Sequence, residues 1–219
     1  MIEPEKLQCG RCPKKICWLG FSSDGPSFCP MKTKLPILEE ARKKLLNKET
    51  KETIRAVALT WKDSGLNLTR VEETIIFAKH MGYKKLGIGF CIGLSEEVEI
   101  LSNILENNGF DVVSACCVAG GLSSEDMDIK EEEKIFPGRG RQPQCNPVGQ
   151  AFLLNEQKTD LNILFGLCTG DDTVFIKHSD APITVLAVKD RILGHNPLAA
   201  IYTSKRFYTR LQPGKPKER

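Results

Sequence analysis

The sequence predicts an α/β fold built on a four-stranded parallel sheet in a three-layer arrangement. Two observations carry this prediction. From Thr69 onward, segments with helical periodicity alternate with short apolar segments of strand length. Glycine, asparagine or proline stands at most of the junctions between them, where chains turn. Regular alternation of helix and strand favours parallel strands joined by right-handed crossovers.

Four apolar segments are predicted to form the strands, and helical segments lie between them. Thr69 and Glu72 have the spacing of a capping box, and Gly82 ends the helix that they begin. Ser95 is expected to cap the next helix. The predicted strands are residues 85–91, 110–116, 160–167 and 183–188.

The expected order of the strands across the sheet is second, first, third, fourth, as in flavodoxin-like folds. The switch point then lies between the first and third strands, where open α/β sheets bind ligands. No G-x-G-x-x-G or Walker A motif stands at a strand exit, which argues against a nucleotide ligand.

Bulk composition excludes several classes of partner. The chain has 219 residues, a formal net charge of +3 and no clustered basic face, so we expect no nucleic acid. No apolar segment reaches the roughly 20 residues of a membrane span. The polar N-terminus differs from a secretory signal, so the expected location is the cytoplasm. A small-molecule substrate or a redox partner protein is expected, and a homo-oligomer stays open.

Composition divides the chain into four parts. The first is rich in cysteine, glycine and proline, the second is helical, and the third carries the helix–strand alternation. A short basic tail ends the chain. The parts are a metal-binding segment (1–34), a helical connector (35–66), an α/β domain (67–210) and a basic tail (211–219).

The N-terminal segment is predicted to bind a metal centre. Cys9, Cys12, Cys17 and Cys29 follow the pattern C-x2-C-x4-C-x11-C-P. Such a segment has too little apolar surface to fold by burial alone, and thiolates around a metal centre would organise it. Structural zinc usually uses two close-spaced pairs, whereas only the first pair is close here. We therefore favour a [4Fe–4S] cluster and keep zinc as the alternative.

A second group of cysteines follows the predicted strands. Cys91, Cys116, Cys117 and Cys168 stand at three strand exits, and Cys145 returns from a long polar loop to the start of a helix. Because the carboxyl ends of parallel strands share one edge, we expect these thiols to meet around a metal or iron–sulfur site. Adjacent side chains tend to point apart, which favours Cys117 over Cys116 as a ligand. A dithiol redox site and unconnected buried cysteines are the alternatives.

Four further residues are candidates for acid–base or binding roles near this edge. Asp171 and Asp172 open the helix after Cys168, and Lys189 stands at the exit of the fourth strand. His195 follows a few residues later. A lone histidine is more often a hydrogen-bonded structural residue than a ligand.

Several segments resemble one known family. GFCIGL, FDVVSACC, CNPVGQAFLLNEQKTDLNILFGLCTGDD and KDRILGHNPLAAIY are similar to the predicted metal-binding proteins called domain of unknown function 1847. The resemblance covers nearly the whole chain and implies metal binding without an assigned reaction. The family pattern has a lysine after the double cysteine and a histidine before the aspartate that follows GLC-x-G. Here Val118 and Asp171 occupy those positions, so chemistry that needs either group would be altered.

Two main functions follow from these features. The first is an iron–sulfur protein in which the N-terminal centre relays electrons and the sheet-edge centre acts on a small molecule. Such a protein would be a cytoplasmic redox or iron–sulfur-dependent enzyme. The second is a non-catalytic zinc-binding or metal-sensing module. A thiol enzyme with one nucleophilic cysteine is a weaker third, because no histidine partner is fixed by the sequence.

Overall fold

The computed structural model describes residues 6–20 and 25–214. The chain divides into two compact units, Met1–Leu59 and Thr60–Arg219, and each is described by itself. Of the basic tail predicted at 211–219, residues 215–219 lie outside the described part. No helix in the part of the chain described here is long and apolar enough to cross a membrane.

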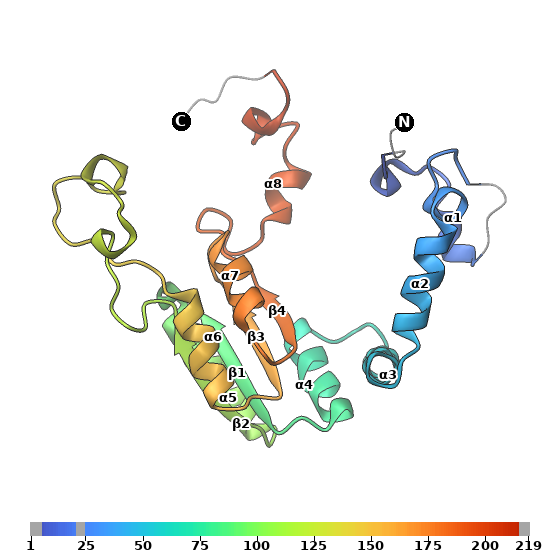
Figure 1. The fold of residues 1–219 in the computed structure, drawn as a ribbon, viewed down its shortest axis with the longest axis horizontal. Helices are drawn as coiled ribbons and strands as arrows, with labels where there is room; N and C mark the ends of the chain where they lie inside the picture. Colours follow the sequence, from blue (N-terminus) through green and yellow to red (C-terminus); the bar gives the residue numbers. More distant parts are fainter. Residues whose placement is uncertain (1–5, 21–24, 215–219) are drawn as a thin grey trace. The chain divides into compact units, whose positions relative to one another are not determined.

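The first unit contains short helical turns followed by longer helices (Figure 1). The long helical segment predicted after Leu35 is interrupted at Leu46 and Asn47, where the Asn47 side chain accepts a hydrogen bond from the Thr50 backbone N–H at 2.9 Å. This cap lets the next helix begin at Lys48, earlier than its apolar residues alone indicate. The elements are 3₁₀ turns at Cys9–Arg11 and Ile16–Leu19, then α1 (Pro30–Thr33), α2 (Leu35–Leu45) and α3 (Lys48–Ser64), which extends into the second unit.

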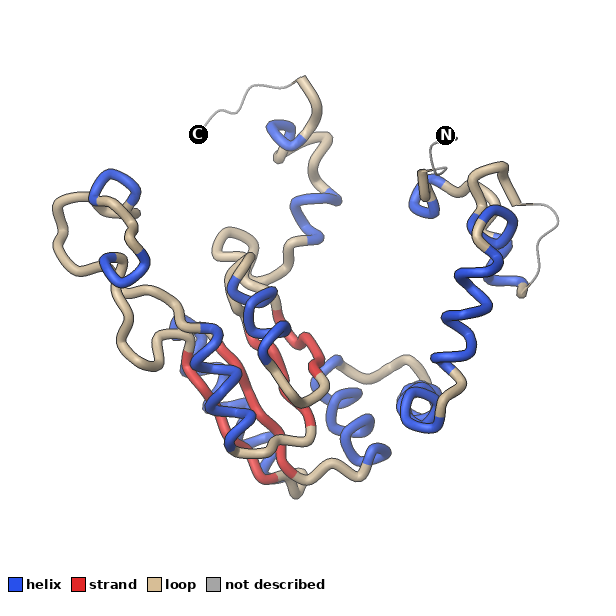
Figure 2. The backbone as a smooth tube through the Cα atoms, in the orientation of Figure 1, coloured by secondary structure: helices blue, strands red, loops and turns tan. Residues whose placement is uncertain are grey.

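The second unit contains the predicted sheet, and its strands end within two residues of the predicted limits (Figure 2). Helices alternate with strands in chain order as far as β4. The elements are α4 (Arg70–Met81), β1 (Lys85–Phe90), α5 (Ser95–Asn107), β2 (Asp111–Cys116), α6 (Pro147–Glu156), β3 (Leu161–Phe165), α7 (Asp171–His178), β4 (Ile183–Ala187) and α8 (Leu198–Tyr202).

The four strands are all parallel and have the order β2-β1-β3-β4, which confirms the prediction. β1 pairs with β2 from Lys85 opposite Asp111 to Phe90 opposite Cys116. On its other side, β1 pairs with β3 up to Phe90 opposite Phe165. The switch point therefore lies between β1 and β3, and both strands end at the same level.

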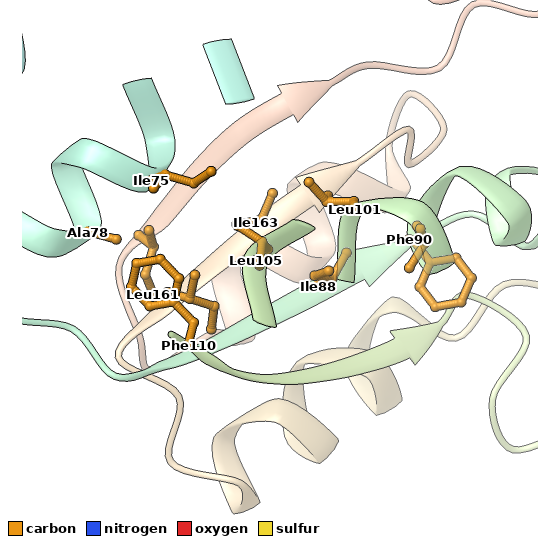
Figure 3. Packing of buried hydrophobic residues seen from close by; sticks show 11 residues of the cluster. Ile75, Ala78, Ile88, Phe90, Leu101, Leu105, Phe110, Leu161 and Ile163 are labelled. Atoms are coloured by element: carbon orange, nitrogen blue, oxygen red, sulfur yellow. The ribbon is translucent and has the colours of Figure 1, made fainter. Parts of the chain in front are cut away.

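One face of the sheet packs against α4 and α5 (Figure 3). Alternate residues of β1 and β3 point to this face, as the period of a strand requires. Ile75 and Ala78 come from α4, and Leu101 and Leu105 come from α5. The strands contribute Leu86, Ile88, Phe90, Leu161 and Ile163.

The opposite face packs against α6 and α7, which Figure 1 shows side by side over the sheet. β1 presents glycines to this face. A Cβ added at Gly89 would lie 2.7 Å from the ring of Phe175, which is fully buried. The missing side chain thus makes room for the aromatic anchor of α7. Gly89 therefore serves the packing of α7 against the sheet.

The helix termini match the predictions in one case and differ in another. Thr69 and Glu72 form the predicted capping box of α4. Ser95, expected as a cap, is instead the first residue of α5, and its hydroxyl donates to the Ile92 carbonyl at 2.7 Å. The reason is a 3₁₀ turn at Ile92–Leu94, which fills the space between Cys91 and α5. This turn positions the backbone N–H groups that follow Cys91.

The long segment between β2 and α6, residues 119–146, is held together by a buried ion pair and by hydrogen bonds of its own. Lys134 is buried, and its ammonium lies 2.6 Å from Glu125 Oε1 and 2.7 Å from Glu131 Oε2. The carboxylate of Asp126 accepts from the backbone N–H and the hydroxyl of Ser123. An isolated bridge pairs Ser123 with Pro143 and closes the segment near its ends. The segment is therefore a compact excursion whose two ends return to the carboxyl edge of the sheet.

Candidate functional site

The first two cysteines of the site are fixed by backbone hydrogen bonds at the ends of β1 and β2. The N–H of Cys91 donates to Phe165 O at 3.3 Å, and that of Cys117 donates to Phe90 O at 2.9 Å. Both bonds extend the sheet ladder one residue beyond the strands. Cys91 and Cys117 are buried. Their positions thus depend on the sheet rather than on a flexible loop.

Cys91 and Cys117 contact each other but differ in acidity. Burial raises the pKa of the Cys91 thiol, but hydrogen bonds from the Gly93 backbone N–H and from Lys189 outweigh it, so the net pKa is lowered. Burial raises the pKa of Cys117 to about 11, although the Ile92 N–H donates to its sulfur at 3.3 Å. The pair therefore combines one acidic thiol with one weakly acidic thiol.

Cys145 is brought to this edge by Asn146. The Asn146 backbone N–H donates to Cys117 O at 2.7 Å, and its side-chain amide donates to Ala119 O at 3.0 Å. The same side chain accepts from the Gly149 N–H at 2.9 Å and so caps α6. Asn146 thereby both closes the segment of residues 119–146 and caps α6, and Cys145 directly precedes it.

The Cys145 thiol lies between Cys117 and Asp171. Burial raises its pKa, and the hydrogen bond to the Asp171 carboxylate and the negative charge of that group raise it further. Asp171 is the first residue of α7. Cys117 and Cys145 therefore both favour the protonated form in the absence of a metal.

Cys168 follows β3 and pairs with a cation from the β4 exit. Arg191 Nη2 donates to Cys168 Sγ at 3.2 Å, and this hydrogen bond raises the pKa of the guanidinium. The negative potentials of Cys91 and Cys145 contribute to the same shift. The backbone N–H of Lys189 donates to Leu167 O at 3.3 Å, which holds the two exit loops together.

The remaining candidate residues pack against apolar side chains or form hydrogen bonds within their own segments. Cys116 is half-buried and packs against apolar residues, as does Val118. Asp172 accepts from the backbone N–H groups of Gly170 and Thr173 at 3.0 and 2.8 Å, which makes it a cap for α7. His195 Nδ1 lies 3.1 Å from the Asp190 N–H. It is thus engaged within its own loop.

Sequence reasoning did not single out Gln150, which lies at the bases of the cysteines. It is fully buried on α6, and its Nε2 donates to Phe90 O at 3.0 Å and to Ala115 O at 2.7 Å. These carbonyls directly precede Cys91 and Cys116. Its Oε1 is a buried acceptor without a hydrogen-bond partner among the residues that the structure describes. A glutamine one turn after Cys145 on an otherwise apolar helix face was the available signal.

The sulfur contacts run in a chain from Cys91 through Cys117 to Cys145. Cys168 joins the group through Arg191. Among residues 6–20 and 25–214, no three His, Cys, Asp or Glu side chains are placed to hold a single metal ion. The thiols therefore gather at one edge without converging on one atom.

The N-terminal cysteines occupy the first unit. Cys9 and Cys17 are exposed, Cys12 is half-buried and Cys29 is buried directly before α1. The Lys15 backbone N–H donates to Cys12 Sγ at 3.4 Å. Residues 21–24, between Cys17 and Cys29, lie outside the described part of the chain.

Comparison with known proteins gives one family. The profile of the family described as "Protein of unknown function (DUF1847)" matches residues 29–186. A relative from Methanocaldococcus jannaschii, described as "Uncharacterized protein MJ0455", is 42% identical over 209 residues. This match spans 95% of the present chain and 100% of the relative. The family match includes Cys29 and all five sheet-edge cysteines, whereas Cys9, Cys12 and Cys17 precede it.

Proposed function

This chain belongs to the DUF1847 family, and from that premise we propose that it is an iron–sulfur protein whose sheet-edge cysteines ligate a cluster. Cys91, Cys117, Cys145 and Cys168 are the ligands of choice. The observation that carries the proposal is the gathering of four thiols from three strand exits and one helix start. Soft thiolate donors favour iron–sulfur clusters, zinc and Cu(I) over hard cations.

The spread of the sulfurs favours a cluster over a single ion. Four ligands of one zinc ion must converge on a single tetrahedral centre. Ligands of a [4Fe–4S] cluster are held apart by the body of the cluster, so they need to share an edge rather than a point. Cys168 joins the other three thiols only through Arg191, so the four sulfurs share an edge rather than one centre. When bound, such a cluster supplies electron transfer.

Charge at the site also supports this assignment. Four thiolates at one edge repel one another, and burial disfavours each ionised form. Lys189 contacts Cys91, and Arg191 contacts Cys168, so two of the four thiols have a cationic partner. Gln150 fixes the backbone below the cysteines. The protein residues thus hold the thiols in place and offset part of their negative charge.

The N-terminal cysteines are proposed to form a second centre. Cys9, Cys12, Cys17 and Cys29 lie in a unit separate from the sheet. The hydrogen bond from the Lys15 N–H to Cys12 Sγ helps to orient one sulfur of the first cysteine pair. A [4Fe–4S] cluster is our choice for this centre, and zinc is the alternative. With a redox partner protein or a small-molecule substrate, the N-terminal centre would relay electrons and the sheet-edge centre would act on the small molecule.

The experiment is metal and acid-labile sulfide analysis of protein purified without oxygen. We expect iron and sulfide in equal amounts in the wild type. Cys168→Ser should lower both without unfolding the first unit, and the double variant Cys9→Ser/Cys12→Ser should lower the remainder. Cys116→Ser is the matched control, because Cys116 packs against apolar residues, and it should leave the sheet-edge content unchanged.

Two other results would count against the proposed iron–sulfur function. Stoichiometric zinc without sulfide would favour the non-catalytic zinc-binding or metal-sensing module. Iron content unchanged by Cys168→Ser would contradict the sheet-edge assignment. Circular dichroism of each variant shows whether the fold is retained, so loss of metal is not confused with unfolding.

A dithiol function is a second candidate, favoured by the contact between acidic Cys91 and Cys117. In that case the Cys91 thiolate attacks a small-molecule disulfide and releases one thiolate. Cys117 then displaces the second thiol as it forms an intramolecular disulfide. The small disulfide gains two electrons and the protein loses them. Mass spectrometry of the metal-free protein after such treatment would show a Cys91–Cys117 linkage.

A further inference from the structure

Two cations at the exit of β4 face the cysteine edge, and neither has a carboxylate partner among residues 6–20 and 25–214. Lys189 is half-buried and Arg191 is exposed. Every salt bridge found among the described residues involves other side chains. Asp190, which lies between them in sequence, uses its carboxylate to accept from the backbone N–H groups of Ile192 and Leu193 at 3.1 and 2.9 Å. The Asp190 carboxylate thus stabilises the turn that it begins.

The two cations contact different sulfurs. The Lys189 ammonium contacts Cys91, and a Cβ added at Gly93 would lie 3.3 Å from Lys189 Nζ. The ammonium therefore lies over the bare backbone of the turn that follows β1. Arg191 reaches Cys168 through Nη2. The cations consequently flank the switch point between β1 and β3, where ligands bind in this class of sheet.

An arginine that bonds to a single sulfur through one nitrogen has further N–H groups that can bind a ligand. A guanidinium carries five N–H donors in a planar fork that matches two oxygens of a carboxylate or phosphate. One of these nitrogens is bonded to Cys168, and the side chain is otherwise exposed at the edge. Lys189 adds a point charge nearby. The pair is therefore suited to an oxyanion as well as to the sulfurs.

We propose that Lys189 and Arg191 form the binding site for an oxyanion group of a small-molecule substrate, a carboxylate or phosphoryl group, next to the cysteine centre. This assignment rests on the proposed iron–sulfur function and names the substrate class of that same site. Asp171, which contacts Cys145, provides a negative group elsewhere on the edge. A substrate would therefore be oriented with its anionic end toward the β4 exit.

The test is anion titration of the anaerobically purified protein, with inorganic phosphate and acetate as probes and neutral acetamide as the control. Binding is followed by the amide signals of Gly93 and Arg191 in nuclear magnetic resonance spectra of metal-free protein and by the visible spectrum of iron-loaded protein. Iron and sulfide are quantified in every sample. We expect one of the two anions to bind, which separates a phosphoryl from a carboxylate ligand, and acetamide to give no change.

The variants decide the role of the cations. Arg191→Met and Lys189→Met should each weaken anion binding tenfold or more relative to the wild type, compared at equal iron and sulfide content. Lys177→Met, at an exposed site on α7, is the matched control and should bind like the wild type. Arg191→Lys should recover only part of the affinity, because it keeps the charge but loses the fork.

Three outcomes would overturn the inference. Equal anion affinity in the wild type and in both methionine variants would show that the cations do not bind the probe. Loss of iron together with anion binding would show that the cations serve the cluster alone. Absence of any anion binding to iron-loaded wild type would remove the substrate site while leaving the cluster assignment intact. Absence of iron and sulfide from the wild type would instead contradict the proposed function.

Discussion

At the scale of single residues, Gln150 connects the core to the site. Its amide group donates to two strand carbonyls that precede cysteines, and the whole side chain is excluded from solvent. Two bonds to buried carbonyls explain why a polar residue is kept on the apolar face of α6. The acceptor Oε1 has no hydrogen-bond partner within the described part of the chain, which is uncommon for a buried polar atom.

Replacement of Gln150 by methionine should lower the free energy of unfolding by about 1–3 kcal/mol, because two strand carbonyls each lose one buried hydrogen bond. Chemical denaturation of the metal-free protein measures the change. Gln157→Met, at the exposed end of the same helix, is the control and should have little effect. Equal stability of Gln150→Met and the wild type would show that the two bonds contribute nothing.

Because the pKa of Cys117 is raised on folding, the metal-free protein should lose stability at alkaline pH. Its pKa rises from 9.0 to about 11 on folding, so between these values the folded state holds a proton that the unfolded state has lost. Stability is fully present below pH 9 and falls as pH rises toward 11, by about 2 kcal/mol. Denaturation from pH 8 to 11 should show a shallower decline for Cys117→Ala than for Cys116→Ala. Identical profiles would contradict the assigned shift.

At the scale of elements, glycine in β1 sets how closely α7 can approach the sheet. Gly89→Ala should destabilise the protein by about 1–3 kcal/mol, because the new Cβ would meet the Phe175 ring. Phe175→Leu should cost less in the Gly89→Ala background than in the wild type. A double-mutant cycle by chemical denaturation measures this coupling. Strict additivity of the two changes would show that the contact is relieved elsewhere.

The excursion of residues 119–146 depends on its buried lysine. Lys134→Met should leave Glu125 and Glu131 without their cation and loosen this segment, while the sheet stays ordered. Hydrogen exchange should therefore accelerate at residues 123–142 and stay unchanged in β1 and β3. Lys130→Met, at an exposed position, is the control. Protected exchange in Lys134→Met would mean that the bridge Ser123–Pro143 suffices.

At the scale of the whole molecule, the order of elements followed from the sequence. Apolar runs such as that around Leu161 to Phe165 marked buried strands, and helix–strand alternation fixed parallel pairing. The strand exits then placed Cys91, Cys117 and Cys168 at one edge. This part was predictable because it depends on periodicity and topology, which are local in the sequence or set by the fold class.

Other features depend on contacts between distant residues and could not be predicted. Arg191 pairs with Cys168 across 23 positions of the chain. Asn146 joins both ends of the excursion, and only the folded chain shows that Ala119 O is its partner. His195, a candidate from sequence, lies within its own loop because its side chain bonds to the backbone of Asp190. Side-chain partners of this kind carry no periodic signal.

The most direct test of the central assignment is an iron-edge anomalous difference map from crystals grown without oxygen. The account predicts a compact peak among Cys91, Cys117, Cys145 and Cys168. A second peak should lie among the N-terminal cysteines if that centre also holds iron. A map of iron-loaded protein without density at the sheet edge, with these four sulfurs apart, would contradict the account.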